Sequence, residues 1–174
     1  MQNNFLEELV AEWLEYNGYF VKRNERVGPL PTGGYKGELD VVAFKPKIKH
    51  LIHVEATTDT DSWENRENRF RDKFALGDEY IKDLFEGLTI PDEIEKKVLF
   101  AYVSNTNHET VGGGKVVPAK DYLLEILREF KKQAFLWRTV PGSLWRTVPE
   151  KYPILRVLQM VAYDWGDFDE ELNK

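Results

Sequence analysis

The sequence lacks several features that would place a protein in a class at once. It contains no cysteine, which excludes disulfide scaffolds and thiolate metal sites and is compatible with a reducing compartment. No apolar run reaches the roughly 18 residues of a membrane span. Residues 1–16 carry four glutamates, a composition unlike that of a signal peptide. We therefore expect a soluble cytoplasmic protein without a membrane partner.

The chain has no excess of positive charge, which argues mildly against a nucleic-acid partner, but its charges are unevenly distributed. The chain has 24 Lys or Arg against 30 Asp or Glu, a formal net charge of −6. The segment Lys115–Arg156 nevertheless holds nine basic residues against four acids. Because salt screens charges beyond about 8–10 Å, such a locally basic face can contact phosphates on an acidic chain. A solvated helix surface with no ligand is the alternative interpretation.

The apolar pattern alternates between helical and strand periods, which is typical of an α/β protein. A length of 174 residues with 42 % hydrophobic residues favours one domain, 1–174, with a core at 5–135 and an extension at 136–174. We expect helices over Phe5–Tyr16, from about Phe70 to near Gly87, and over Ala119–Phe135, with a last apolar segment at Pro153–Tyr163. The expected strands are Tyr19–Val27, Leu39–Phe44, Leu51–Ala56 and Lys97–Ser104.

Two features in the second half of the chain carry less information. His108 and Gly112–Gly114 are expected in a loop, where a lone histidine is a surface residue and three glycines without a following Lys-Ser/Thr make no phosphate loop. The hexapeptide LWRTVP occurs twice, at Leu136–Pro141 and Leu144–Pro149. Two copies are too few for a solenoid, so a local duplication that lengthens a loop is the plainest account. The two Trp-Arg pairs could instead stack on bases or form an interface.

Two acids stand out in the segment Gly37–Thr58. If its two apolar strands form a simple hairpin, Phe44 faces Leu51 and Asp40 faces Glu55. Opposed residues of an antiparallel pair share a face, with Cβ atoms about 4.5–5.5 Å apart. Two carboxylates so close in an apolar sheet require a proton or a cation between them.

Other charged residues could reach these carboxylates. Glu7 lies along the edge of the apolar face of the first helix, where it could point inward or simply favour the helix dipole. Arg66, Arg69 and Lys73 recur at helical spacing and share one flank of the helix that follows Glu55. That flank could project back toward the acids, or its cations could form ordinary salt bridges with neighbouring residues.

The ordered set of motifs resembles the PD-(D/E)xK nuclease superfamily, the restriction-endonuclease-like fold of Holliday-junction resolvases and Mrr-type enzymes. The resemblance covers roughly Leu6–Ala134. Members carry a helix of the form Glu-x-x-(Val/Ile)-x-x-x-Leu-x-x-x-Gly, followed by acids on two strands. The matching residues here are Glu7, Val10, Leu14, Gly18, Asp40 and Glu55. The resemblance implies an αβββαβα order around a central mixed sheet of about four to five strands, flanked by helices.

The resemblance also implies a chemistry for each residue. Asp40, Glu55 and the backbone carbonyl of Ala56 would bind Mg²⁺ or Mn²⁺, and Glu7 would bind a second metal or a metal-bound water. The superfamily signature ends in Glu-x-Lys, whereas this chain reads Glu55-Ala56-Thr57, so the lysine is missing there. Superfamily members can supply it from the following helix, which makes Lys73 the candidate and Lys36 a weaker one.

The resulting expectation is a divalent-metal-dependent nuclease that hydrolyses phosphodiester bonds. DNA is the expected substrate, RNA stays open, and a homodimer would suit the cutting of two strands. The alternatives are a catalytically inactive relative that binds nucleic acid or a protein, and a purely structural carboxylate pair satisfied by Arg66 or Arg69. Basic residues are expected to hold the nucleic-acid backbone without reading its sequence. They are Arg66, Arg69, Lys131, Lys132 and Arg138.

Overall fold

A computed structural model describes residues 4–103, 107–142 and 146–164 of the chain. The chain divides into two compact units, Met1–Ala119 and Lys120–Lys174. The division falls at the start of the third α-helix, earlier than the end of the expected core at residue 135.

The first unit begins in the order expected from the sequence. It starts with a helix, continues with three strands, a long helix and a strand, and ends with two further short strands. The elements are α1 (Phe5–Tyr16), β1 (Phe20–Pro29), β2 (Tyr35–Lys45), a 3₁₀ turn η1 (Pro46–Ile48), β3 (His50–Thr57), α2 (Trp63–Leu84), β4 (Glu95–Phe100), β5 (Thr110–Val111) and β6 (Gly114–Pro118). The expected helix Phe5–Tyr16 is confirmed to the residue.

The strands form one mixed sheet in the order β1-β2-β3-β4-β6-β5. The hairpin pairs β1/β2 and β2/β3 are antiparallel, β4 lies parallel to β3 and to β6, and β5 pairs antiparallel with β6. The sheet therefore has six strands among the described residues, where four to five were expected. The additional pair, β5 and β6, occupies the segment expected to be a loop. It was missed because two- and five-residue strands around a Gly-Gly turn leave no alternating pattern to read.

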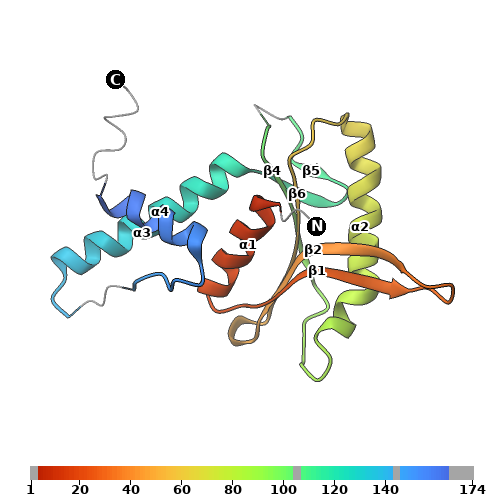
Figure 1. Ribbon diagram of the computed structural model, residues 1–174, viewed down its shortest axis with the longest axis horizontal. Coiled ribbons are helices and arrows are strands. Elements are labelled where there is room, and N and C mark those ends of the chain that lie inside the picture. Colours follow the sequence, from red (N-terminus) through yellow and green to blue (C-terminus); the bar gives the residue numbers. More distant parts are fainter. Residues whose placement is uncertain (1–3, 104–106, 143–145, 165–174) are drawn as a thin grey trace. The chain divides into compact units, whose positions relative to one another are not determined.

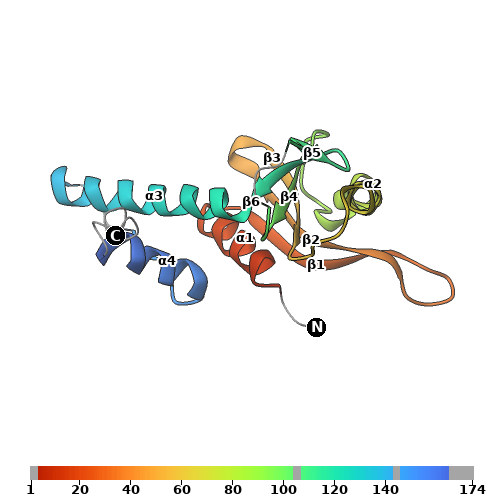
Figure 2. The ribbon, with the colours of Figure 1, turned by 90° about the horizontal axis from the view of Figure 1, so that it is seen from above.

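Two helices of the first unit cover opposite faces of the sheet (Figures 1 and 2). Helix α1 packs on β1, β2 and β3, and α2 crosses the other face. Both helices have side-chain caps of the kind that satisfies a free backbone N–H at an N-terminus. Asn4 accepts the N–H of Leu6 at 3.1 Å, and Ser62 accepts that of Asn65 at 3.3 Å.

Apolar packing fixes α2 along its length. One cluster lies beneath its C-terminal half and includes Phe44, Leu51, Ile81 and Phe85. A second lies beneath its N-terminal half, where the main residues are Phe70, Phe74, Val98 and Phe100. Because interior side chains interdigitate at high density, these clusters fix the position of α2 on the sheet.

The second unit contains α3 (Ala119–Thr139) and α4 (Pro153–Asp164), so the last apolar segment is helical. The two LWRTVP copies differ in backbone: Leu136–Thr139 ends α3, whereas residues 146–149 form no helix. Gln159 holds the second copy by accepting the N–H of Val148 and donating to the carbonyl of Arg146, each at 2.9 Å. The first copy therefore extends a helix, where a longer loop was expected. Leu144 and Trp145 lie outside the described residues, and stacking by the two Trp-Arg pairs stays the alternative interpretation.

No helix in the described part of the chain is long and apolar enough to cross a membrane.

Candidate functional site

The register of the central hairpin is the one read from the sequence. Val42 pairs with His53 and Phe44 with Leu51. The regular ladder ends at Val41 and Val54, one step before the two acids. From there the acids themselves connect the strands: Glu55 Oε1 accepts the N–H of Asp40 at 3.3 Å, and Asp40 Oδ2 accepts the N–H of Ala56 at 2.9 Å.

Lys73 of α2 joins these two carboxylates. Its Nζ lies 2.6 Å from Asp40 Oδ1 and also forms an ion pair with Glu55 Oε2. Lys73 is the lysine that the resemblance to the nuclease superfamily made the candidate. The weaker candidate, Lys36, instead pairs with Glu79 at 3.0 Å and lies over the ring of Tyr80.

The three side chains are shielded from solvent to different degrees. Glu55 is fully buried, Asp40 is 8 % exposed and the Lys73 side chain is 28 % exposed. Burial and repulsion by Glu55 raise the pKa of Asp40 from 3.8 to about 7, against the attraction of Lys73. Burial would raise the pKa of Glu55 too, but the hydrogen bond from His53 and the charge of Lys73 hold it below 4.5. One carboxylate thus stays ionised while the other takes up a proton near neutral pH.

The lysine keeps its own proton. Burial lowers the pKa of Lys73, but the charges of Glu55 and Asp40 outweigh that effect and the pKa lies above 10.5. With both acids ionised, the three groups carry one net negative charge. A cation is therefore the ligand that this site would bind most readily.

The start of α1 reaches the same region. Asn4 Nδ2 donates to the carbonyl of Ala56 at 3.2 Å, which ties α1 to the end of β3. Burial and repulsion by Glu55 and Glu38 raise the pKa of Glu7 above 4.5, while Asn4 and Lys73 act in the opposite direction. Glu7 therefore lies within electrostatic range of the site. It does not complete a three-ligand cluster: among the described residues, no three His, Asp or Glu are grouped to hold a metal ion.

The residues present fit a cation that keeps much of its water. Asp40 and Glu55 provide hard carboxylate oxygens. A third oxygen, the carbonyl of Ala56, accepts a hydrogen bond from Asn4 Nδ2 at 3.2 Å, so a cation would share it with Asn4 or displace that bond. Mg²⁺ and Mn²⁺ suit a site of few oxygen ligands, because Mg²⁺ is commonly held by one or two carboxylates plus waters.

One member of the site was missed from the sequence. His53 Nε2 lies 2.7 Å from Glu55 Oε1, and both side chains are fully buried. The available signal was its position two residues before Glu55, since residues i and i+2 of a strand share a face.

The two arginines of the α2 flank lie elsewhere. Arg66 is buried; it pairs with Asp59 at 3.2 Å and stacks on the rings of Trp63 and Phe100. Arg69 pairs with Asp59 and, at 3.2 Å, with Asp61. Neither arginine satisfies Asp40 or Glu55, which excludes the specific ion-pair network considered above. Their engagement with acids also gives no support to a role in holding nucleic acid, especially for the buried Arg66.

The remaining predicted nucleic-acid contacts belong to the second unit. Lys131, Lys132 and Arg138 all lie on α3, and Arg138 stacks on Tyr163 with its guanidinium carbon 4.7 Å from the ring centre. They stay predicted contacts.

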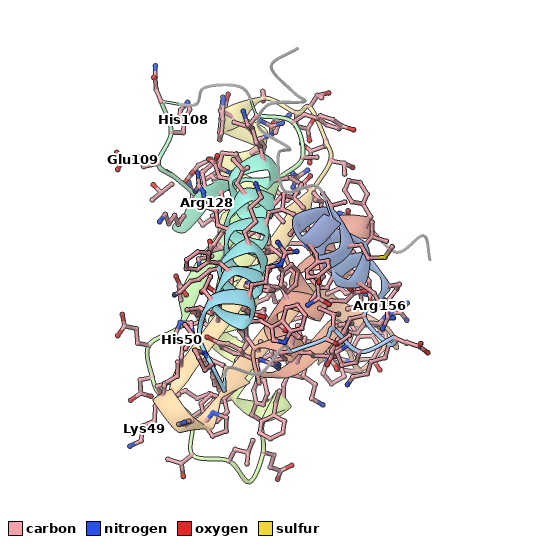
Figure 3. The ribbon with its side chains drawn as sticks, turned by 90° about the vertical axis from the view of Figure 1, so that its left-hand side faces the viewer. Lys49, His50, His108, Glu109, Arg128 and Arg156 are labelled. Atoms are coloured by element: carbon pink, nitrogen blue, oxygen red, sulfur yellow. The ribbon has the colours of Figure 1, made fainter. Side chains whose placement is uncertain are left out.

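The three histidines of the chain do not gather. His50, the first residue of β3, follows Lys49 and lies at the opposite end of the first unit from His108 (Figure 3). His50 bonds the hydroxyl of Tyr19 at 2.7 Å and pairs with Glu95 at 2.9 Å. His108 is exposed, as expected, and stacks on Trp63 with ring centres 4.2 Å apart.

The fold and the site define an α/β protein with a buried cluster of two acids, a lysine and a histidine.

Comparisons with known proteins add little to this description. No protein-family profile and no curated protein matches the chain. Among solved structures, the chain is similar to AF1548, a protein of unknown function, with 13 % identity, 92 % of this chain and 97 % of that chain covered, and a TM-score of 0.38.

Proposed function

We propose that the protein is a divalent-metal-dependent nuclease that hydrolyses phosphodiester bonds, with DNA as the expected substrate. The observation that supports this most directly is the meeting of Lys73 with Asp40 and Glu55. Thr57 stands where the PD-(D/E)xK signature has lysine. Lys73 brings an ammonium group to the two acids from the next helix, so the same three functional groups come together.

The metal and the chain have separate roles in this proposal. Mg²⁺ or Mn²⁺, held by Asp40, Glu55 and the Ala56 carbonyl, would polarise the scissile phosphate and lower the pKa of a bound water. Because Lys73 keeps its proton, its ammonium group suits hydrogen bonding to that water and to the phosphate oxygens rather than proton abstraction. The shielding of Glu55 and Asp40 from solvent strengthens these charge interactions.

A cleavage assay tests the proposal. Protein with Mg²⁺ or Mn²⁺ is incubated with single-stranded, duplex and branched DNA and with RNA. We expect cleavage by the wild type and its loss, by at least about 100-fold, in Asp40→Asn and Glu55→Gln. Asp92→Asn, which alters an exposed acid paired with Lys82, is the control that should cleave normally. Absence of cleavage of every substrate by the metal-loaded wild type would refute the enzyme proposal.

The role of Lys73 has its own test. Lys73→Ala should lose cleavage while its Mn²⁺ affinity, measured by titration calorimetry, stays at or above that of the wild type. The reason is that the ammonium group occupies the same carboxylate oxygens that would bind the ion. Lys82→Ala is the matched control. An active Lys73→Ala protein would remove the lysine from the mechanism.

A non-catalytic binding protein is the second candidate function. It is favoured by the fact that Lys73 already contacts both acids, so the cluster has a partner without metal. In that case the wild type and Glu55→Gln should show equally weak Mg²⁺ and Mn²⁺ binding in calorimetry. Carboxylate-dependent metal uptake would decide for the nuclease.

A further inference from the structure

His53 lies in the apolar core beneath α2. Its side chain has no solvent exposure, and its imidazole meets the ring of Phe74 edge-on with centroids 5.0 Å apart. The facing residue on β2 is Val42, which is also fully buried. A valine, leucine or phenylalanine would suit such surroundings without burying a polar atom.

The imidazole divides the two oxygens of Glu55 between different partners. Oε1 lies 2.7 Å from His53 Nε2 and accepts the N–H of Asp40 at 3.3 Å. Oε2 is left to Lys73. Because Oε1 already accepts the N–H of Asp40, it acts as an acceptor here, and the hydrogen of the 2.7 Å contact lies on Nε2.

Two costs accompany this arrangement. His53 Nδ1 is buried with no hydrogen-bond partner among the described residues, which typically costs about 1–3 kcal/mol. Opposite it, α2 has Gly77 in its interior, where glycine costs about 1 kcal/mol relative to alanine. A Cβ at position 77 would lie 2.5 Å from Nδ1 and 2.8 Å from Cε1. The glycine therefore provides the space that the imidazole occupies.

We propose that His53 is a positioning residue: its Nε2–H···Oε1 bond fixes the Glu55 carboxylate so that Oε2 faces Lys73 and the cation, and Gly77 admits the ring. The assignment rests on the proposed function, because it takes Glu55 to be a metal ligand. Hydrogen-bonding partners behind a metal ligand typically change metal affinity by 10–100-fold when they are removed.

Metal affinity in three variants tests the assignment. In His53→Phe an aromatic ring is kept and the hydrogen bond is lost, so we expect Mn²⁺ binding, measured by calorimetry, to weaken about tenfold or more. In His53→Gln a donor remains, and part of the affinity should return. Phe74→Leu disturbs the packing of the same imidazole without touching the bond, and its affinity should stay within about twofold. Wild-type affinity in His53→Phe, or an equal loss in Phe74→Leu, would overturn the proposal.

Nitrogen NMR of the metal-free protein gives a readout independent of cleavage and of metal. The imidazole of His53 should show a slowly exchanging hydrogen on Nε2, which should shift or vanish in Gly77→Ala. A hydrogen on Nδ1 alone would refute the positioning role. If the wild type binds no Mn²⁺, the proposed nuclease function is refuted. The position of the imidazole hydrogen then still tests whether His53 orients the Glu55 carboxylate.

Discussion

Helix α2 takes part in two ion clusters that differ in their balance of charge. Near its middle, Lys73 is the single cation between Asp40 and Glu55. One to two turns earlier, Arg66 and Arg69 share Asp59. Burial and repulsion raise the pKa of Asp40 to about 7, whereas the hydrogen bond from Thr57 and the pairing with Arg69 outweigh partial burial and lower that of Asp59 to about 2.

The two clusters differ in whether their charges balance, which distinguishes a structural cluster from a candidate site. Two arginines on Asp59, with Asp61 alongside, leave no excess charge and nothing for a ligand to neutralise. The pair Asp40 and Glu55 has one cation for two acids, in a more buried place. With both acids ionised the cluster carries one excess negative charge, which either a proton on Asp40, whose pKa is about 7, or a bound cation can balance.

The largest expected effect is that of Lys73→Met on stability. In metal-free buffer at about pH 8, removing the ammonium leaves two buried carboxylates unpaired, and the free energy of unfolding in urea should fall by about 3–5 kcal/mol. Added Mn²⁺ should restore part of the loss, because a ligand bound only by the folded state stabilises it. Lys82→Met, at an exposed pair, should change stability little. Equally small losses of unfolding free energy in Lys73→Met and Lys82→Met would show that Asp40 and Glu55 do not depend on the charge of Lys73.

The next effect is a difference in pH dependence between the clusters. Asp40 has a folded pKa of about 7 against 3.8 ordinarily, so between these values the folded protein binds a proton that the unfolded chain has released. Stability should then fall as pH rises from about 4 to 7, by up to about 1.4 kcal/mol per unit, and Asp40→Asn should remove that slope. Asp59, with its lowered pKa, should act oppositely, its contribution being lost as pH falls from about 4 to 2. Urea unfolding across this range, for the wild type, Asp40→Asn and Asp59→Asn, measures both slopes.

Arg66→Met should have a smaller effect than Lys73→Met. Arg66 is buried and donates to the carbonyl of Asp59 at 2.8 Å, but methionine preserves much of its packing on Trp63 and Phe100. Asp59 also keeps Arg69. We expect a loss of about 1–2 kcal/mol in urea unfolding and unchanged Mn²⁺ affinity. Loss of Mn²⁺ affinity in Arg66→Met would show that the arginine cluster contributes to the cation site, which contradicts the distinction between the two clusters.

The sequence predicted the acids and the lysine better than their surroundings. Strand alternation placed Asp40 against Glu55, and helical spacing placed Lys73 on one flank with Arg66 and Arg69, because both depend on backbone periods that tertiary contacts rarely change. The resemblance to the nuclease superfamily then singled out Lys73 among these cations. His53 was missed because an apolar strand indicates burial, but not which buried residue bonds a neighbour. The partner of Arg66 was missed because Asp59 lies in a polar run without a period, so its position depends on the loop before α2. Neither the sequence pattern nor the fold identifies the metal or the substrate, so both are proposals.

The smallest effect is expected for Arg69→Gln, and its dependence on salt distinguishes the exposed arginine pairs from the buried cluster. The Arg69 side chain is 36 % exposed and pairs with Asp59 and with the half-exposed Asp61. Exposed pairs contribute less than about 1 kcal/mol and are screened by salt. The stability difference between Arg69→Gln and the wild type should therefore shrink between about 0.05 and 0.5 M NaCl, whereas the loss in Lys73→Met should persist, because buried charges are screened much less. A Lys73→Met loss that salt removes as readily would mean that Asp40 and Glu55 are as solvated as the arginine cluster, and the charge argument for a cation site would then fail.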